Sequence, residues 1–260
     1  MPRFFLSGNH ISPPDSNGVR FARITGADAH HIVCSLRMKP GDSLTLCDMQ
    51  SNEYSCLLDS IQNDPHASPA EYTVCARIVS CHPGSNEPPF DAVLYQALPK
   101  GDKMEIIVQK AVEAGVSSIV PFLSERCISR PDAETLTRKI ERWQRIALEA
   151  AKQCGRSIIP QILPCLPFRS AVDEAAASAS HAFLCYEGDD TVPLGHVLEE
   201  PGITASYRFF IGPEGGFSLA EVAYAQSRGL TLAGLGKRIL RCETASGFVL
   251  SCLVFRHELS

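Results

Sequence analysis

Short apolar segments separated by turn residues fill the first 80 positions of the chain. Runs that suit strands alternate with Gly, Asn, Asp and Pro, which is typical of strands joined by tight turns. A helical stretch is expected at 27–36, a turn at 39–42, and strands at 19–23, 43–48, 54–61 and 72–80. Residues 1–80 are therefore predicted to form a small β-barrel with one short helix.

A segment rich in Pro, Gly and polar residues at 82–89 separates this region from a different pattern. Beyond it, apolar runs alternate with stretches whose apolar residues recur every three or four positions, as on one face of a helix. Strands are expected at 91–97, 116–122, 158–163, 181–186, 207–212 and 230–235, and helices at 102–115, 137–154, 169–179, 218–228 and 243–256. This alternation indicates a mostly parallel sheet covered on both faces, so residues 81–260 are predicted to form an α/β domain.

The composition is that of a soluble globular protein, with 45% hydrophobic and 20% charged residues among 260. No apolar run approaches the ~18–20 residues of a membrane span, and the first ten residues lack the apolar stretch of a secretory signal. The eleven cysteines include no Cys-x-x-Cys pair and no zinc spacing, which favours buried, reduced thiols over metal ligands. We expect a cytoplasmic protein that binds neither a membrane nor a metal.

Charge is unevenly distributed, although the formal net charge is −5. Residues 1–40 carry five basic and two acidic side chains, residues 126–156 carry eight and four, and residues 170–200 carry seven acidic side chains and no Lys or Arg. On the predicted helix 137–154, Arg138, Arg142 and Arg145 share one face, which fits either a solvated or a phosphate-binding surface. Local basic patches of this kind are what bind nucleic-acid phosphates.

The segment 209–221, Phe-Phe-Ile-Gly-Pro-Glu-Gly-Gly-Phe-Ser-Leu-Ala-Glu, joins an apolar strand to a helix through a glycine-rich turn. Ser218 and Glu221 have the spacing of a capping box. Glycines at the carboxyl end of a strand let backbone groups approach a ligand closely, and open α/β sheets bind ligands at that edge. A ligand loop is therefore favoured over a simple turn. The dinucleotide and Walker fingerprints are missing, which disfavours an NAD-dependent oxidoreductase.

Two further strand ends carry candidate ligand groups. The strand predicted at 230–235 leads into Gly-Lys-Arg-Ile-Leu-Arg-Cys-Glu at 236–243, a basic loop followed by an acid that complements the dipole of the last helix. The strand at 181–186 leads into Glu187 and Gly188. No Gly-x-Ser-x-Gly nucleophile motif is present.

Taken together and in order, these segments resemble the bacterial ribosomal RNA small subunit methyltransferase E family, within the SPOUT class of knotted methyltransferases. The resemblance spans nearly the whole chain and includes Ile-Gly-Pro-Glu-Gly-Gly at 211–216 and Leu-Gly-Lys-Arg-Ile-Leu-Arg-Cys-Glu-Thr-Ala at 235–245. The family usually has Pro in place of Lys237 and Thr in place of Cys242. Its remaining matches are at 1–5, 31–42, 96–105, 124–126, 142–143 and 149–156.

The resemblance implies a PUA-like, RNA-binding β-barrel at 1–80 and, at 81–260, a SPOUT-type α/β methyltransferase domain with a trefoil knot. It also implies S-adenosylmethionine as methyl donor, a homodimer, and methylation of N3 of a uridine in 16S ribosomal RNA, either free or in the 30S subunit. In such domains the three strand-end loops hold the cofactor. The implied binding residues here are Tyr186, Glu187, Gly212, Pro213, Glu214, Gly215, Gly216, Leu235, Gly236, Ile239 and Leu240.

Basic side chains are the candidates for RNA binding and for catalysis. A cation near the uracil oxygens would stabilise the negative charge that develops when N3 loses its proton, and Arg241 and Arg238 are the candidates. Glu243 either orients an arginine, acts as the base, or only caps its helix. A non-catalytic RNA-binding or ribosome-assembly factor of the same fold is the alternative. RNA contacts are expected from Arg3, Arg37, Lys39, Arg126, Arg142 and Arg156.

Overall fold

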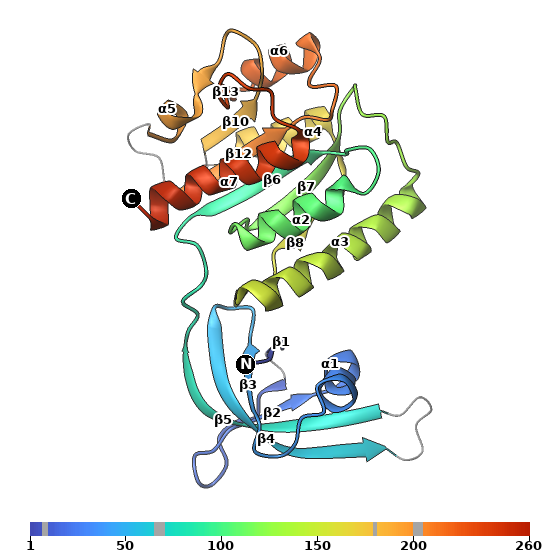
Figure 1. Ribbon diagram of the computed structural model, residues 1–260, viewed down its shortest axis with the longest axis vertical. Coiled ribbons are helices and arrows are strands. Elements are labelled where there is room, and N and C mark those ends of the chain that lie inside the picture. The colour runs from blue at the N-terminus through green and yellow to red at the C-terminus, as the bar shows by residue number, and fades with distance from the viewer. Residues whose placement is uncertain (7–9, 65–70, 179–180, 200–204) are drawn as a thin grey trace. The chain divides into compact units, whose positions relative to one another are not determined.

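The computed structural model describes residues 1–6, 10–64, 71–178, 181–199 and 205–260, which form two compact units (Figure 1). The first unit comprises residues 1–87 and 152–159, and the second comprises 88–151 and 160–260. The boundary expected after residue 80 falls inside strand β5 (Glu71–Pro83), so the division at 87/88 comes later than predicted. Within the described residues, no helix is both long and apolar enough to cross a membrane.

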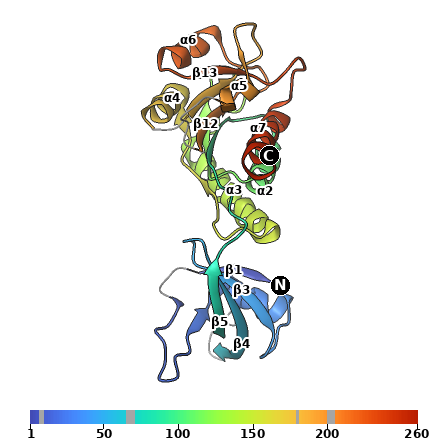
Figure 2. The same ribbon diagram turned by 90° about the vertical axis from the view of Figure 1, so that its left-hand side faces the viewer.

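The first unit is a five-stranded sheet whose order is β1-β3-β4-β5-β2. β1 pairs with β3 in parallel, and the other pairs are antiparallel. Two register shifts between β4 and β5 let these long strands bend into a half-barrel (Figure 2). The predicted helix is an α-helical turn, α1, continued by a π-helical turn, η2. The bounds are β1 Arg3–Phe5, β2 Phe21–Ile24, β3 Ser43–Cys47, β4 Asn52–Asp64, α1 Gly26–His30 and η2 His31–Ser35.

Two carboxylates hold the segment 152–159 in the first unit. Glu53 pairs with Arg3 at 2.8 Å and accepts a hydrogen bond of 2.7 Å from Ser157 Oγ. Glu87 pairs with Arg156 at 2.7 Å and accepts hydrogen bonds from the backbone N–H groups of Ser157 and Ile158. The predicted strand at 158–163 is wrong for most of its length. The backbone N–H of Ile158, where that strand was expected to begin, donates to the Glu87 carboxylate instead of to a neighbouring strand.

The second unit is built around a parallel sheet in the order β11-β13-β10-β12-β6-β7-β8, with β9 also paired to β7. The expected parallel α/β architecture is confirmed, and β6 has the predicted bounds. β8, β9 and β11 have two residues each. The strands are β6 Asp91–Ala97, β7 Ser118–Leu123, β8 Gln161–Ile162, β9 Leu166–Pro167, β10 His181–Cys185, β11 Val192–Pro193, β12 Ser206–Ile211 and β13 Thr231–Gly234.

Helices cover both faces of this sheet (Figure 2). The helices α2 and α7 pack against each other on one face, and α4 and α6 contact each other on the other face. α3 begins four residues earlier than predicted, and α5 was not predicted. The bounds are α2 Lys103–Glu113, α3 Ala133–Cys154, α4 Phe168–Ala177, α5 Leu194–Glu199, α6 Leu219–Ser227 and α7 Cys242–Glu258.

Aromatic side chains on the α4 face anchor the glycine-rich turn to the core. Tyr95 and Phe210 stack with ring centroids 4.4 Å apart, and Phe122 and Phe168 complete the cluster. Phe217, the residue directly after the glycines, is buried and lies 5.7 Å from the Phe168 ring. The turn therefore leaves from a core strand and returns into the core within six residues.

The Glu53 network makes the stability of the first unit depend on pH. Burial alone would raise the pKa of the Glu53 carboxyl, but the hydrogen bonds from Arg3 and Ser157 outweigh it and hold that pKa below its usual value of 4.5. The stabilisation is therefore present above pH 4.5 and is lost as the pH falls through the lowered folded-state pKa.

We expect Glu53→Gln to lower the free energy of unfolding by about 1–3 kcal/mol at pH 7, since the charge-assisted bonds to Arg3 and Ser157 are lost. Urea denaturation followed by circular dichroism measures the difference, which should shrink as the pH falls below 4.5. Glu134→Gln, at an exposed position of α3, serves as the control and should change stability by less than about 0.5 kcal/mol. Equal stabilities of Glu53→Gln and wild type at pH 7 would contradict the assignment.

Candidate functional site

Three loops meet at the carboxyl edge of the parallel sheet because their strands are neighbours. β10 lies between β12 and β13, and Leu184 is in register with both Phe210 and Leu232. The chain segments after these strands, beginning at 186, 212 and 235, therefore start side by side. The expectation that the glycine-rich turn and the basic loop lie at one ligand-binding edge is confirmed.

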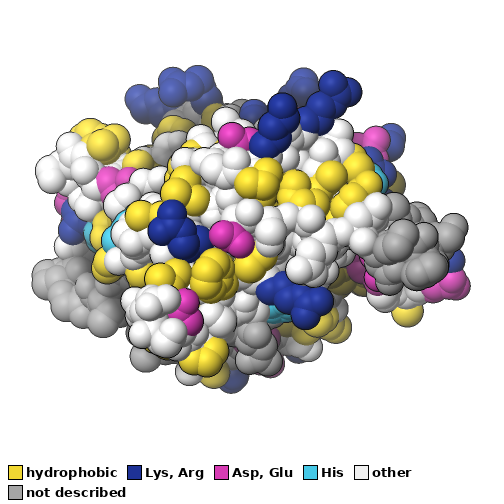
Figure 3. Space-filling view, turned by 90° about the horizontal axis from the view of Figure 1, so that it is seen from below, with side chains coloured by type: hydrophobic (Ala, Val, Ile, Leu, Met, Phe, Trp, Pro, Cys, Tyr) yellow, Lys and Arg dark blue, Asp and Glu magenta, His cyan; other side chains and the backbone are white. Residues whose placement is uncertain are grey.

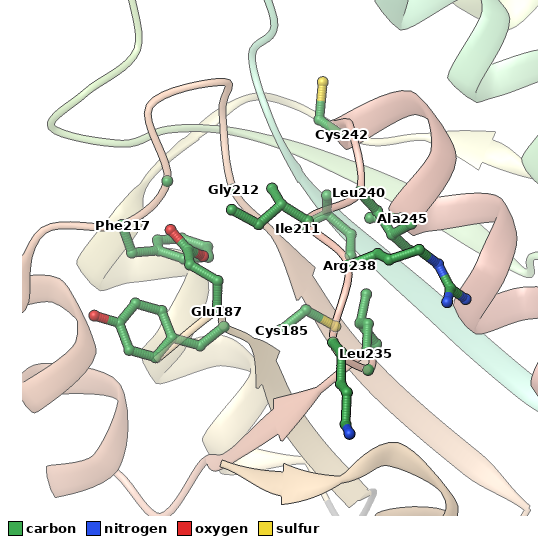
Figure 4. Close-up of a pocket in the computed structure, with 15 residues that line it drawn as sticks. Cys185, Glu187, Ile211, Gly212, Phe217, Leu235, Arg238, Leu240, Cys242 and Ala245 are labelled. Atoms are coloured by element: carbon green, nitrogen blue, oxygen red, sulfur yellow. The ribbon is translucent and has the colours of Figure 1, made fainter. Parts of the chain in front are cut away.

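The three loops and the start of α7 line an open pocket, whose empty space is about 660 Å³ when the open solvent at its mouth is included (Figure 4). Glu187 and Phe217 lie on one side of it, and Arg238, Leu240 and Ala245 lie on the opposite side (Figure 4). The lining residues are Cys185, Tyr186, Glu187, Ile211, Gly212, Gly216, Phe217, Leu235, Gly236, Lys237, Arg238, Ile239, Leu240, Cys242 and Ala245. The pocket thus combines apolar side chains, exposed backbone and charged groups of both signs.

Most of the predicted cofactor residues line this pocket, but part of the glycine-rich turn does not. Pro213, Glu214 and Gly215 are missing from the lining. A Cβ atom at Gly215 would lie 3.3 Å from Arg126 Cβ, so this glycine faces loop 124–126. Sequence reasoning missed Cys185, Ile211, Phe217, Lys237, Cys242 and Ala245 as lining residues; their positions directly beside the glycines and within the basic loop were the available signal.

Backbone conformation requires glycine at two positions of the pocket wall. Gly216 has φ +66°, and a Cβ there would lie 2.6 Å from the Glu187 carboxylate. Gly236 has φ +102°, with nothing within 4 Å of an added Cβ. Positive φ values of this kind are costly for residues other than glycine. The first glycine lets two loops approach closely, and the second leaves backbone open to the pocket.

A lysine that sequence reasoning did not select joins two of the loops. Lys103 Nζ, at the start of α2, pairs with Glu214 at 2.7 Å and lies 3.7 Å from Glu243. Burial opposes ionisation of Glu214, but the hydrogen bond from Lys103 outweighs it and lowers the pKa of that carboxyl. The hydrogen bond to Glu214 likewise raises the pKa of Lys103. Lys103 therefore connects the glycine-rich turn to the beginning of α7.

Glu243 is ionised at neutral pH in this setting. Its own backbone N–H is the main cause of a lowered pKa, and Lys103 lowers that pKa further. The Cys242 thiol donates to Glu243 Oε2 at 3.2 Å. These contacts fit an acid that orients its neighbours at a helix N-terminus.

The buried carboxylate of Glu221 connects the first turn of α6 to the end of β7. The capping box predicted with Ser218 is confirmed, since each side chain binds the backbone N–H of the other residue. Glu221 also accepts hydrogen bonds from Ser124 Oγ at 3.1 Å and from the Glu125 backbone N–H at 2.8 Å. This carboxylate fixes loop 124–126 beside the glycine-rich turn.

The predicted functional arginines of the second unit occupy different settings. Arg238 lines the pocket, whereas Arg241 is exposed at the N-cap of α7. Arg126 Nη1 donates to the Gly215 carbonyl at 2.9 Å, and Arg142 on α3 pairs with Glu105 at 2.9 Å. Arg238 and Arg241 make no side-chain hydrogen bond or ion pair with any described residue, so both are available to a ligand.

In the first unit, the structure separates four candidate RNA contacts into two kinds. Arg37 and Lys39 are exposed. Arg3 and Arg156 are instead mostly buried, with side-chain exposures of 13% and 5%, and they pair with Glu53 and Glu87. These pairings favour a structural role for Arg3 and Arg156 over the predicted RNA contact. In the view from below, Lys and Arg side chains lie in separate groups rather than in one patch (Figure 3).

Two family models match the chain. A model described as an RNA methyltransferase domain matches residues 86–254, and one described as an RNA methyltransferase PUA domain matches residues 24–65. The ribosomal RNA small subunit methyltransferase E of Bacillus subtilis is 31% identical over 242 residues, covering 91% of this chain and 90% of that protein. The protein of the same name from Synechocystis is 31% identical, covering 85% and 69%.

A solved structure has the same fold along nearly the whole chain. The crystal structure of a ribosomal RNA small subunit methyltransferase E from Neisseria gonorrhoeae, bound to S-adenosyl methionine, superposes with a TM-score of 0.81. It is 29% identical and covers 98% of each chain. The PUA-like and methyltransferase architecture expected from the sequence is therefore confirmed, while the trefoil knot stays a prediction.

We expect Glu221→Ala to destabilise the protein by about 1–3 kcal/mol, because donors buried around the carboxylate lose their partner. Hydrogen exchange should accelerate at the backbone amides of Glu125 and Ser218, which donate to it. Gln226→Ala, on the exposed side of the same helix, should leave both amides unchanged. Slow exchange at both amides in Glu221→Ala would show that other contacts hold the loop.

Proposed function

Because the chain belongs to the ribosomal RNA small subunit methyltransferase E family of RNA methyltransferases, we propose that it methylates N3 of a uridine in 16S ribosomal RNA with S-adenosylmethionine as donor. The observation that carries the proposal is the pocket formed by the three strand-end loops. An enzyme of this kind would act in the cytoplasm, on free RNA or on the assembled 30S subunit.

The pocket suits S-adenosylmethionine in its chemistry. Phe217, Leu240 and Ile211 offer apolar surface to a planar base, and Gly212 and Gly236 leave backbone groups open to polar atoms. The Glu187 carboxylate offers an acceptor and a negative charge to a cationic ligand. Bound there, the donor would supply an electrophilic methyl group.

The residues around the pocket would prepare the uridine. N3 is protonated at neutral pH and is a weak nucleophile, so the enzyme must stabilise the charge left when that proton departs. Arg241, exposed and unpaired among the described residues, can place its guanidinium on a uracil oxygen, and Arg238 offers a second cation at the wall. We assign Glu243 and Lys103 to holding this loop and the glycine-rich turn in place.

RNA binding would draw on the cations that the fold leaves exposed. Arg37 and Lys39 are the candidates of the first unit, and Arg126 and Arg142 are those of the second. Arg126 already contacts the glycine-rich turn, so a phosphate bound there would lie beside the catalytic pocket. Arg3 and Arg156 are left out of this surface because carboxylates of the first unit already neutralise them.

A homodimer is part of the proposal. An apolar hollow of about 950 Å³ lies between α5 and α7, and Phe248 and Phe255 on its wall are 39% and 64% exposed. Exposed aromatic patches of this kind mark association sites. The position of α7 would let a second copy lie close to the loop that carries Arg241.

Mass mapping of ribosomal RNA from cells with and without this gene tests the proposed function. A methylated uridine in 16S RNA that disappears with the gene and returns with purified protein and S-adenosylmethionine supports it. A protein that binds 16S RNA and leaves its methylation unchanged would instead be the non-catalytic assembly factor.

Substitution of Gly216 tests the cofactor site. Gly216→Ala strains a left-handed backbone position and moves Glu187, so calorimetry should show S-adenosylmethionine binding weakened by about tenfold or more, or ~1.4 kcal/mol. The matched control is Gly229→Ala, which lies beyond α6 with φ +86° and open space around an added Cβ, and which does not line the pocket. Equal affinities of the two variants for S-adenosylmethionine would show that Gly216 is not part of the cofactor site.

Substitution of Arg241 separates chemistry from cofactor binding. Arg241→Ala should slow single-turnover methylation by about 100-fold, since one oriented donor to a developing anion is lost. S-adenosylmethionine affinity should stay within about threefold, because a cation does not help to bind a positively charged donor. Arg241→Lys should recover only part of the rate, as lysine lacks the planar fork. Normal turnover by Arg241→Ala would transfer the role to Arg238.

A further inference from the structure

A second pocket lies at the same carboxyl edge of the sheet, on the other side of the β12–α6 connection. It has a volume of about 720 Å³ and opens where β7 ends and where α4 and α6 begin. Leu123, Pro167 and Phe168 form an apolar wall, and Arg130 and Arg169 stand at its rim. None of the residues assigned to the cofactor or to the reaction lines it.

Arg169 is held in place without using its hydrogen-bond donors. Its guanidinium carbon lies 4.5 Å from the centre of the Tyr224 ring, and the Tyr224 hydroxyl donates to Asp173 at 2.8 Å. Asp173 is in turn paired with Arg228 at 2.8 Å. Within the described part of the chain, Arg169 has no hydrogen bond or ion pair, so its planar set of N–H donors is orientated and free for an anion.

Arg130 is fixed at the rim by backbone. Its Nη2 donates to the carbonyls of Ser124 and Glu125, both at 2.9 Å, and the rest of the guanidinium is exposed. The Glu221 carboxylate in the pocket wall is already bound by three donors of the protein, which offsets its charge. The Glu125 side chain is exposed at the rim and adds a negative charge there, so a phosphate would have to bind on the side of Arg169 and Arg130.

The combination of an apolar wall and a preorientated arginine fits a nucleotide. A base can lie against Leu123 and Pro167, which cover the buried ring of Phe168, while its phosphate binds Arg169. α4 begins at Phe168 and, among the described residues, no side chain caps it, so its first backbone N–H groups add to the attraction for a phosphate.

The second pocket is tied structurally to the first. Loop 124–126 forms part of its wall and reaches the glycine-rich turn through the bond from Arg126 to the Gly215 carbonyl. Glu221 lines the second pocket and belongs to the capping box directly after that turn. The two pockets are therefore joined by loop 124–126 and by the capping box of α6.

Building on the proposed function, we propose that this second pocket binds a nucleotide that flanks the methylated uridine, with the base on the apolar wall and the phosphate on Arg169. The pocket acts as a substrate subsite that fixes the register of the RNA. It contributes to RNA binding and to sequence context, and leaves the affinity for S-adenosylmethionine unchanged.

The test compares Arg169→Ala and Arg169→Lys with Lys110→Ala, which removes one positive charge from the exposed side of α2. RNA binding is measured by fluorescence anisotropy at several salt concentrations, using a 16S fragment that the wild type methylates. For Arg169→Ala we expect about tenfold weaker RNA binding, a raised KM with kcat within about twofold, and a salt slope reduced by ~0.7–0.9. Arg169→Lys should restore the salt slope and only part of the affinity, because it keeps the charge and loses the stacking on Tyr224.

Photocrosslinking identifies the nucleotide itself. RNA carrying 4-thiouridine at single positions next to the target should crosslink to the peptides containing Phe168 or Tyr224 from one flanking position. The inference is overturned if Arg169→Ala matches Lys110→Ala in affinity and salt slope while the wild type methylates the RNA. If the wild type does not methylate 16S RNA at all, the proposed function fails as well. Methylation by the wild type is therefore measured first, and its result tells the two failures apart.

Discussion

The carboxylate of Glu221 brings together parts of the second unit that lie far apart in the chain. It closes the capping box of α6 and accepts hydrogen bonds from Ser124 and Glu125, nearly one hundred residues earlier. Burial of a carboxylate is tolerated here because its donors and the positive end of α6 compensate the charge. Since the glycine-rich turn precedes this cap directly and Phe217 is anchored in the core, this one buried group fixes where the glycine-rich turn ends and where loop 124–126 lies beside it.

Much of this arrangement was predictable because it depends on local pattern. The strand at 91–97, the capping box and the placement of the glycine-rich turn and the basic loop at the ligand edge follow from apolar runs and glycine positions, whereas the part of the third loop came from the family resemblance. Strands β8, β9 and β11 were not predictable, since two residues carry no periodicity. The pairing of Lys103 with Glu214 could not be predicted either, because 111 residues separate them and only the fold brings them together.

Partners distinguish structural cations from functional ones, and partners cannot be read from the sequence. Arg3 and Arg156 looked like RNA contacts because they lie in basic stretches. In the fold, both arginines are mostly buried in the first unit, where Arg3 pairs with Glu53 and Arg156 pairs with Glu87. The sequence pattern did not single out Arg169, yet it stacks on Tyr224 and its donors have no partner among the described residues. A charge run therefore predicts how many cations a surface could have, whereas burial and pairing determine which of them can meet a phosphate.

The mixed charge around the first pocket fits the charge change of the proposed reaction. A deprotonated uridine is an anion and a sulfonium donor is a cation, and transfer of the methyl group leaves both neutral. Water stabilises the separated charges, so a pocket that excludes water and provides oriented groups favours their combination. Glu187 faces the pocket with one sign and Arg238 with the other, while Lys103 holds Glu214 and Glu243 in the loops around it. In the proposed reaction, such a site would stabilise each reactant through a different side chain and would need no large net charge, which is consistent with the acidic composition of this protein.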